Sequence, residues 1–416
     1  MTDRISPFLA KKKPDVAVLM TDRLALGSLG AYGNAAAETP AFDRLAAESV
    51  LFDRFYTASP TLDAAYRSFW TGDAGAKSAE SLAKKAADAG YLTIFVTDEP
   101  ALLDGERSGA FERVLSLEVP KPTEWAETVE ETALYRFFAQ TAETLIQARR
   151  EGRPLFFWAH SVGFAGAWDF PLALRALFQE DEEDPAPYAG LNPPFAELFG
   201  QIGRKKRLAA ADTPSAIPDF DRLCEIAESY AAGCSVWDRG LEAFLGLLAA
   251  EKFFDSGLLA LGATGGFPLG EHGRVGFVPD LEPLFYAEEL HRPLLVRFPG
   301  PAEAAARIDA LVTETDLYRT LGALFAGEES DQALGDLAGG RKESLRPFLR
   351  QTLELGGGML RGLTTLEWFL RVETAANGAE STELYVRPDD RHDVNEVASR
   401  CAETVEELKK QLHGGE

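Results

Sequence analysis

The feature that most constrains the fold is a short apolar run within residues 15–20, which read Asp-Val-Ala-Val-Leu-Met and lead into Thr21 and Asp22. A continuous apolar run of this length, bounded by polar residues, is typical of a parallel strand that is buried on both faces. Ligands of open α/β sheets bind at the carboxyl ends of such strands. Asp22 is therefore a candidate site residue because of its position.

Helical and strand patterns then alternate along the chain. Helical spacing at 81–89 stops at Gly90 and is followed by a strand at 91–96. Alternation of this kind predicts an α/β fold, with a large mixed and mostly parallel sheet that is flanked by helices. The later pairs are helix 128–149 with strand 155–159 and helix 219–250 with strand 258–261, followed by a strand at 293–297.

The pattern changes after residue 338. Three glycines at 356–358 are followed by strand-like runs at 367–373 and 382–386 and by a final helix near 396–412. We expect a main α/β domain over residues 1–338 and a small C-terminal α+β subdomain over residues 339–416. Residues 178–218 are rich in Glu, Asp and Pro, and we expect them to cross the surface as a lid, an interface or a long loop.

Charge and composition exclude several classes of partner. The net charge of -24, from 66 acidic and 42 basic residues, repels phosphate backbones and anionic lipids, so we expect neither nucleic acid nor a membrane as a partner. No apolar run is long enough for a signal peptide or a bilayer span, which predicts a cytoplasmic protein. The cysteines, Cys224, Cys234 and Cys401, lack the spacing of a disulfide framework or a zinc site.

A longer set of segments carries a family signal. It includes Asp22 after the first strand and Gly-Glu-His-Gly at 270–273, and it spans residues 14–34, 39–49, 52–60, 71–72, 89–93, 230–238, 269–273, 285–300, 383–385 and 393–398. Together these segments resemble the sulfatase family, within the alkaline phosphatase superfamily, over nearly the whole chain. The resemblance implies an alkaline-phosphatase-like fold. It also implies calcium-dependent hydrolysis of sulfate esters by a formylglycine, made from the cysteine of a Cys-x-Pro-Ser-Arg signature.

The segment that matches this signature has lost the nucleophile. Residues 60–67 read Pro-Thr-Leu-Asp-Ala-Ala-Tyr-Arg. Leu62 stands at the position of the cysteine, and its isobutyl group can neither form the aldehyde hydrate nor ligate a metal. Tyr66 stands where the family has its arginine, and Arg67 follows one residue later, which on a helix is about 100° away. We therefore expect no intact catalytic residue in this signature.

The resemblance places the calcium ligands at two pairs of positions, Asp22 with Arg23 and Thr264 with Gly265. Of these four residues only Asp22 offers a carboxylate, whereas calcium prefers several carboxylate oxygens. Asp63, in the signature segment, offers one further carboxylate oxygen for a metal ion. We therefore expect no bound cofactor. We also expect Arg23 to reach Asp22 and to replace the cation through a charge-assisted hydrogen bond.

Two further family motifs also differ here. The family's Gly-Lys-Trp-His is Thr-Asp-Glu-Pro at 97–100, which includes Asp98, and a later family histidine is absent from residues 163–166. His160 and His272 remain. We interpret His160 as a residue of the core or sheet end and His272 as a residue that structures its loop, rather than as an acid or a base.

The combined losses favour a catalytically inactive homologue that acts in binding or interaction, with a protein or a small anionic ligand as its partner. One alternative is a sulfate or phosphate ester hydrolase that uses water or Asp63 instead of formylglycine. Another is a structural subunit whose former cleft is filled by Leu62, Tyr66 and Trp70. The sequence leaves the ligand, the partner and the oligomeric state open.

Two arrangements would separate these hypotheses. A cleft packed with side chains would favour the structural subunit. An open pocket lined by Arg23 and Arg67, of a size that suits an anion, would favour ligand binding.

Overall fold

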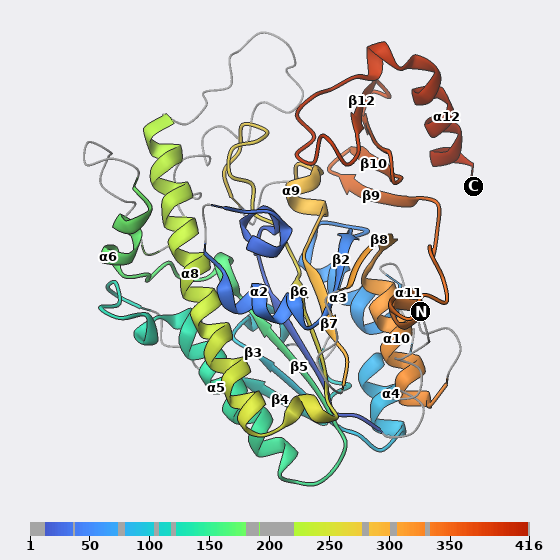
Figure 1. Ribbon diagram of the computed structural model, residues 1–416. Coiled ribbons are helices and arrows are strands. Elements are labelled where there is room, and N and C mark those ends of the chain that lie inside the picture. Colours follow the sequence, from blue (N-terminus) through green and yellow to red (C-terminus); the bar gives the residue numbers. More distant parts are fainter. Residues whose placement is uncertain are drawn as a thin grey trace.

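The computed structural model of the protein describes residues 13–35, 38–73, 80–103, 108–117, 122–179, 191, 220–276, 283–299, 306–328 and 333–414. A large sheet lies between two layers of helices, and a smaller sheet lies beyond one end of it (Figure 1). The order of the large sheet is β4-β3-β5-β1-β6-β7-β2-β8. Its strands are β1 (Val16–Thr21), β2 (Val50–Phe55), β3 (Leu92–Thr97), β4 (Arg113–Ser116), β5 (Leu155–Ser161), β6 (Leu258–Ala263), β7 (Leu294–Arg297) and β8 (Ala306–Val312).

β1 lies in the interior of this sheet and runs parallel to both of its neighbours, β5 and β6. Thr21 pairs with Ser161 on one side and with Ala263 on the other, so the three strands end at the same level. β7 runs antiparallel to β6 and β2. The predicted mixed, mostly parallel sheet is therefore confirmed, and the residues that follow these three strand ends meet at one edge.

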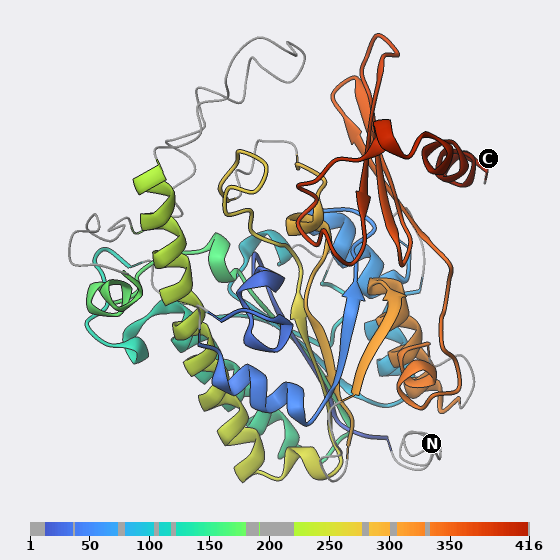
Figure 2. The same cartoon turned by 45° about the horizontal axis from the view of Figure 1, so that its top comes forward.

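Helices cover both faces of the sheet (Figures 1 and 2). The alternation of side chains along β1 shows why two layers are needed, because Leu19 points into one apolar core and Val18 into the other. The first core is formed with α2 (Pro40–Ala47), α5 (Ala133–Arg149) and α8 (Phe220–Ala250). The second is formed with α3 (Leu62–Thr71), α4 (Leu82–Asp88), α10 (Glu314–Ala326) and α11 (Ala333–Ala338), and α6 (Leu172–Arg175) and α9 (Ala287–Leu290) are single turns.

The C-terminal region forms a second sheet, which is antiparallel and has the order β12-β11-β10-β9. Leu408 and Leu412 of α12 (Ala402–His413) pack against Leu363 and Leu370 of this sheet. The expected α+β character is confirmed, whereas the boundary at 338/339 stays a prediction. The strands are β9 (Leu349–Leu355), β10 (Gly358–Thr364), β11 (Trp368–Thr374) and β12 (Glu380–Val386).

Some expected elements differ in their bounds. The helix expected at 128–149 begins at Ala133, because Thr132 caps it by accepting a hydrogen bond from the N–H of Tyr135 at 3.2 Å. Most of the expected surface segment at 178–218 lies outside the described residues, so its role stays a prediction. None of the described helices is both long and apolar enough to cross a membrane.

Candidate functional site

Asp22 lies at the carboxyl end of β1 and is buried against the residues that follow β6. Its Oδ1 accepts hydrogen bonds from the N–H of Arg23 at 3.0 Å and from Oγ1 of Thr264 at 3.1 Å. Nε of Arg23 lies 3.7 Å from Oδ2 of Asp22. The expected pairing of Asp22 with Arg23 is present as a buried ion pair, but this distance is too long for the predicted charge-assisted hydrogen bond. Arg23 instead donates from Nη1 to the carbonyl of Gly266 at 3.4 Å.

These residues do not fit a calcium ion. A guanidinium lies beside the carboxylate where further oxygen ligands would be needed. There is also no room for a side chain at Gly265, because a Cβ there would lie 2.6 Å from Oδ1 of Asp22 and 3.1 Å from Nε of Arg23. Across the described residues, no three His, Cys, Asp or Glu side chains are grouped so that they could hold a metal ion.

The backbone at Arg23 is fixed in an unusual conformation. Its φ angle is 58°, in the left-handed region that a long side chain rarely adopts. The hydroxyl of Tyr230 donates to the carbonyl of Arg23 at 2.8 Å and accepts from the N–H of Ala25 at 2.8 Å. This buried tyrosine therefore holds the turn that directs the Arg23 side chain toward Asp22.

The position of the family nucleophile lies in the first turn of α3. Thr61 caps this helix by accepting from the N–H of Ala64 at 3.4 Å, so that Leu62 is its first residue. Leu62 is half-buried and packs against the second apolar core. One turn later, Tyr66 is 1% exposed, and its ring centroid lies 4.7 Å from that of Trp70 in an edge-on contact. Aromatic rings thus fill the region next to the former nucleophile.

Tyr66 also contacts His160, the residue of β5 that pairs with Met20 of β1. The hydroxyl of Tyr66 lies 2.5 Å from Nδ1 of His160, and the two rings are nearly perpendicular. Burial lowers the pKa of His160 to about 4, so the ring is neutral at pH 7. A neutral imidazole that is closed off from solvent and bonded to a buried phenol has the environment of a core residue.

Asp63 and Arg67 lie on the outer side of α3. They are one helical turn apart and form an ion pair in which the Arg67 side chain is 51% exposed. Arg23 is buried whereas Arg67 faces solvent, so the two arginines do not form the shared anion pocket considered above. Asp63 is likewise directed away from the core that holds Tyr66.

Asp98 joins the ends of two neighbouring strands. It follows β3, and its Oδ1 accepts a hydrogen bond from the N–H of Val162, just after β5, at 2.7 Å. Burial raises the pKa of Asp98 to about 7, against the lowering effect of this hydrogen bond. At the place of the family's lysine-containing motif, the chain therefore has a carboxyl group that is used to connect strands.

A fully buried ion pair that was not predicted from the sequence completes this region. Nη1 of Arg292, just before β7, lies 3.4 Å from Oε1 of Glu314, the first residue of α10. Nη2 of Arg292 donates to the carbonyl of Ser59 at 3.5 Å, which ties it to the loop before α3. Burial lowers the pKa of Arg292 to about 10, and the charges of Asp22 and Arg23 also act on it. The His-Arg-Pro sequence at 291–293 was the only signal of this residue.

His272 lies in a different part of the molecule, where it connects two loops. Its Nε2 donates to the carbonyl of Asp393 at 2.8 Å, and its Nδ1 lies 2.6 Å from Oε1 of Glu288. The ring stacks on Tyr286 with 3.7 Å between centroids. The Gly-Glu-His-Gly loop is therefore tied to the C-terminal region, in a geometry that suits a structural histidine.

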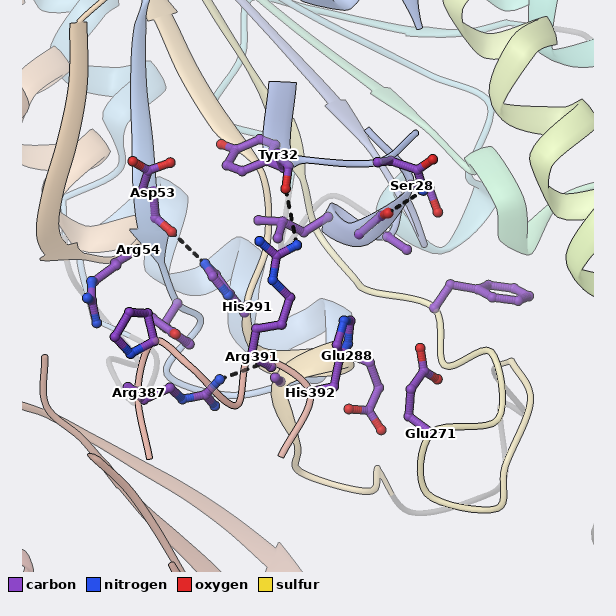
Figure 3. Close-up of a pocket in the computed structure, with 18 of the residues that line it drawn as sticks. Ser28, Tyr32, Asp53, Arg54, Glu271, Glu288, His291, Arg387, Arg391 and His392 are labelled. Carbon is purple, nitrogen blue, oxygen red and sulfur yellow. Dashed lines mark hydrogen bonds between the residues drawn. The ribbon is translucent and has the colours of Figure 1, made fainter. Parts of the chain in front are cut away.

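A pocket of about 390 Å³ opens beside Glu288 (Figure 3). Its walls come from the loop after β1, from β2, from the loop that contains Glu271, from the turn at 287–291 and from the C-terminal loop at 387–392. Asp22, Leu62 and Tyr66 do not line it. Sequence reasoning missed this pocket because its walls come from segments that are far apart in the chain.

Solved structures share this fold. A putative sulfatase from Bacteroides fragilis superposes with a TM-score of 0.72 at 16% identity, covering 97% of this chain and 95% of that chain. The phosphonate monoester hydrolase of Agrobacterium radiobacter gives 0.70 at 17% identity, with 96% and 94% covered. A protein solved in complex with its substrate D-glucosamine-2-N,6-O-disulfate gives 0.70 at 17% identity, with 97% and 99% covered. Likeness at these identities shows the fold alone.

The family follows from the sequence itself. A search of curated protein sequences finds no significant match. The family model described as Sulfatase, however, matches residues 14–327, well over half of the 416 residues. The matched range contains both the altered nucleophile segment with Leu62 and the Asp22, Thr264 and 270–273 positions. This chain belongs to the sulfatase family.

Proposed function

We propose that this protein is a catalytically inactive member of the sulfatase family that acts through binding or interaction. The observation that carries the proposal is the filled region at the carboxyl ends of β1 and β5. Hydrolysis of a sulfate ester needs a nucleophile and positive charge opposite the developing anion. The chain has Leu62 and the buried Tyr66 at the signature, and the buried cation at the end of β1, Arg23, is already paired with Asp22.

The balance of buried charge also supports the proposal. Asp22 pairs with Arg23, and Glu314 pairs with Arg292, so each cation of this region lies against a carboxylate. Buried ion pairs of this kind are self-neutralising and leave little net field for a sulfate group. A substrate would also have to displace the Tyr66 ring from its contacts with Trp70 and His160.

The alternative of an ester hydrolase with an altered mechanism depends on Asp63 or on an activated water. A general base works within hydrogen-bond reach of its water and beside groups that stabilise the transition state. Asp63 is 38% exposed and is paired with Arg67 on the outer side of α3. Because the adjacent cation is neutralised by this pairing, the geometry favours the inactive protein over this alternative.

Hydrolysis assays on the full chain test the proposal. We expect no turnover of aryl sulfates, aryl phosphates or aryl phosphonates above the uncatalysed rate, with calcium, manganese or zinc added in turn. An active phosphonate monoester hydrolase serves as the positive control. The matched variants are Asp63→Asn on α3 and Asp88→Asn on α4, because each removes the acid of an exposed helical ion pair. Turnover that is lost in the first variant and kept in the second would contradict the proposal.

Metal analysis provides an independent test of the same proposal. After dialysis against calcium-containing buffer and then metal-free buffer, we expect clearly less than one calcium ion per chain, because a guanidinium lies against the Asp22 carboxylate. Stoichiometric calcium that disappears in Asp22→Asn but remains in Asp88→Asn would show that the metal site is intact.

A further inference from the structure

The pocket beside the C-terminal loop carries charges that are not neutralised within it. Three arginines of its lining are paired, because Arg54 contacts Asp309, Arg307 contacts Asp53 and Arg387 contacts Asp393. The lining also holds Arg391 and two glutamates, Glu271 and Glu288, and His272 contacts one of the two carboxylate oxygens of Glu288. In Figure 3 the two glutamates lie on one side of Arg391, and Asp53 and Arg54 lie on the other.

Glu288 is held in place through one carboxylate oxygen, and its other carboxylate oxygen accepts no hydrogen bond from the described residues. Its side chain is 4% exposed, and its Oε1 contacts Nδ1 of His272 at 2.6 Å. Its Oε2 is buried and has no hydrogen-bond partner among the described residues. A buried carboxylate oxygen without a donor is costly, so a ligand donor at this position would be favourable.

The residues behind Glu288 fix its orientation. Nε2 of His272 donates to the carbonyl of Asp393, and its ring stacks on Tyr286, so the imidazole cannot turn away without losing both contacts. This is the support that a preorganised binding group requires. Glu271 adds a second negative charge. Burial raises the pKa of Glu288, and the field of Glu271 adds to this effect.

Arg391 provides the opposite charge on the C-terminal loop. Its Nη1 donates to the carbonyl of Tyr32 at 3.2 Å, which directs the side chain across the pocket (Figure 3). The loop itself is held by Arg387, whose Nη1 donates to the carbonyl of Arg391 at 3.0 Å. The other guanidinium N–H groups of Arg391 have no protein partner among the described residues, and a planar guanidinium is well suited to a carboxylate.

We propose that this pocket binds a small zwitterion, with a primary ammonium group against Glu271 and Glu288 and a carboxylate against Arg391. The volume of about 390 Å³ is at the lower end of the range for small-molecule sites, which suits a compact ligand rather than a polysaccharide. The inference rests on the proposed binding role. It does not depend on the loss of catalysis, because Asp22, Leu62 and Tyr66 of the filled region do not line the pocket.

Calorimetric titration of the full chain tests the inference with four probes: γ-aminobutyrate, ε-aminocaproate, hexylamine and hexanoate. We expect at least one of the two amino acids to bind about tenfold more tightly than the amine or the acid alone, since each charge-assisted hydrogen bond contributes about that factor. Glu288→Gln should reduce the affinity of the amino acid to that of hexanoate. Arg391→Gln should reduce it to that of hexylamine.

The control variant is Arg44→Gln, which removes the arginine of an exposed pair with Glu242 outside the pocket and should leave affinity unchanged. If Glu288→Gln does not fold, Glu271→Gln replaces it as the test of the ammonium side. No measurable binding of any of the four probes at about 10 mM would overturn the inference. So would affinities that neither the glutamate nor the arginine variant changes. These outcomes are separate from the hydrolysis assays, which report on Asp63 and the filled region.

Discussion

The region around Tyr66 and the pocket around Glu288 show two ways in which one fold treats polar groups. Around Tyr66, aromatic rings take up the space and each cation lies against a carboxylate. Around Glu288, hydrogen bonds from His272 fix the polar groups, but volume remains open between the walls. The difference teaches that one fold can fill the region at its strand ends with side chains while it leaves a pocket open elsewhere.

The largest effect on stability is expected when the buried ion pair between Arg292 and Glu314 is broken. Arg292→Leu should lower the free energy of unfolding by about 3–5 kcal/mol, because it leaves the Glu314 carboxylate buried without its partner. The double variant Arg292→Leu with Glu314→Leu should recover most of that loss. Urea denaturation of the three proteins measures both effects, and a single variant as stable as the parent would show that the pair is not buried in solution.

The second test compares packing in the two regions. Tyr66→Ala should cost about 3–5 kcal/mol, because it opens a cavity among Trp70, Trp158 and His160. Leu26→Ala, at the half-buried lining of the pocket, should cost about 1 kcal/mol, because its surroundings are already open. Equal losses in urea denaturation would contradict the distinction between a filled region and an open one.

The third test uses pH. Burial lowers the pKa of His160 from 6.5 to about 4, so the unfolded chain binds more protons than the folded protein between these values. The contribution of His160 to stability should therefore fall as the pH decreases through this window, by about 2 kcal/mol between pH 7 and pH 5. Asp98, whose pKa is raised to about 7 by burial, contributes in the opposite sense, so the test is the difference between two proteins. His160→Asn should lose this contribution, and the stability of the parent relative to the variant should fall by about that amount over the same pH range in thermal unfolding. The exposed His413→Asn should keep it, and an unchanged slope in His160→Asn would refute the assignment.

The smallest expected effect on the free energy of unfolding concerns Arg391, which lines the pocket. Arg391→Gln should change the free energy of unfolding by less than about 0.5 kcal/mol, because the residue is exposed and its side chain makes one hydrogen bond to the described residues, to the carbonyl of Tyr32. Thermal unfolding without added ligand checks this value. A large loss would mean that Arg391 serves the fold rather than a ligand.

The sequence was sufficient to predict the strands that are buried on both faces. Continuous apolar runs predicted β1, β5 and β6, because such strands have no polar face to confuse the pattern. β8 was not predicted, since it lies at the edge of the sheet and its first residues alternate between half-buried and exposed. β9 and β10 were missed because their polar residues resemble a loop, although Gly356 and Gly357 form the turn between them.

For the site, the sequence could show what had been replaced but not what the replacements contact. Leu62, Tyr66 and Arg23 were identified from the motif, and the Tyr66–Trp70 packing was considered as one outcome. The contact of Tyr66 with His160 and the pairing of Arg292 with Glu314 could not be predicted, because they join separate elements whose side-chain directions depend on the complete core. The pocket was beyond sequence reasoning for the same reason.

The position of β1 has a consequence for how the chain reaches its fold. β1 is synthesised first among the strands, yet the partners of Thr21, Ser161 and Ala263, follow about 140 and 240 residues later. Pairing over such separations makes folding slow, because long loops must close before the contacts form. An apolar strand therefore emerges from the ribosome well before its neighbours exist, and its apolar faces have no strand partners until β5 and β6 follow.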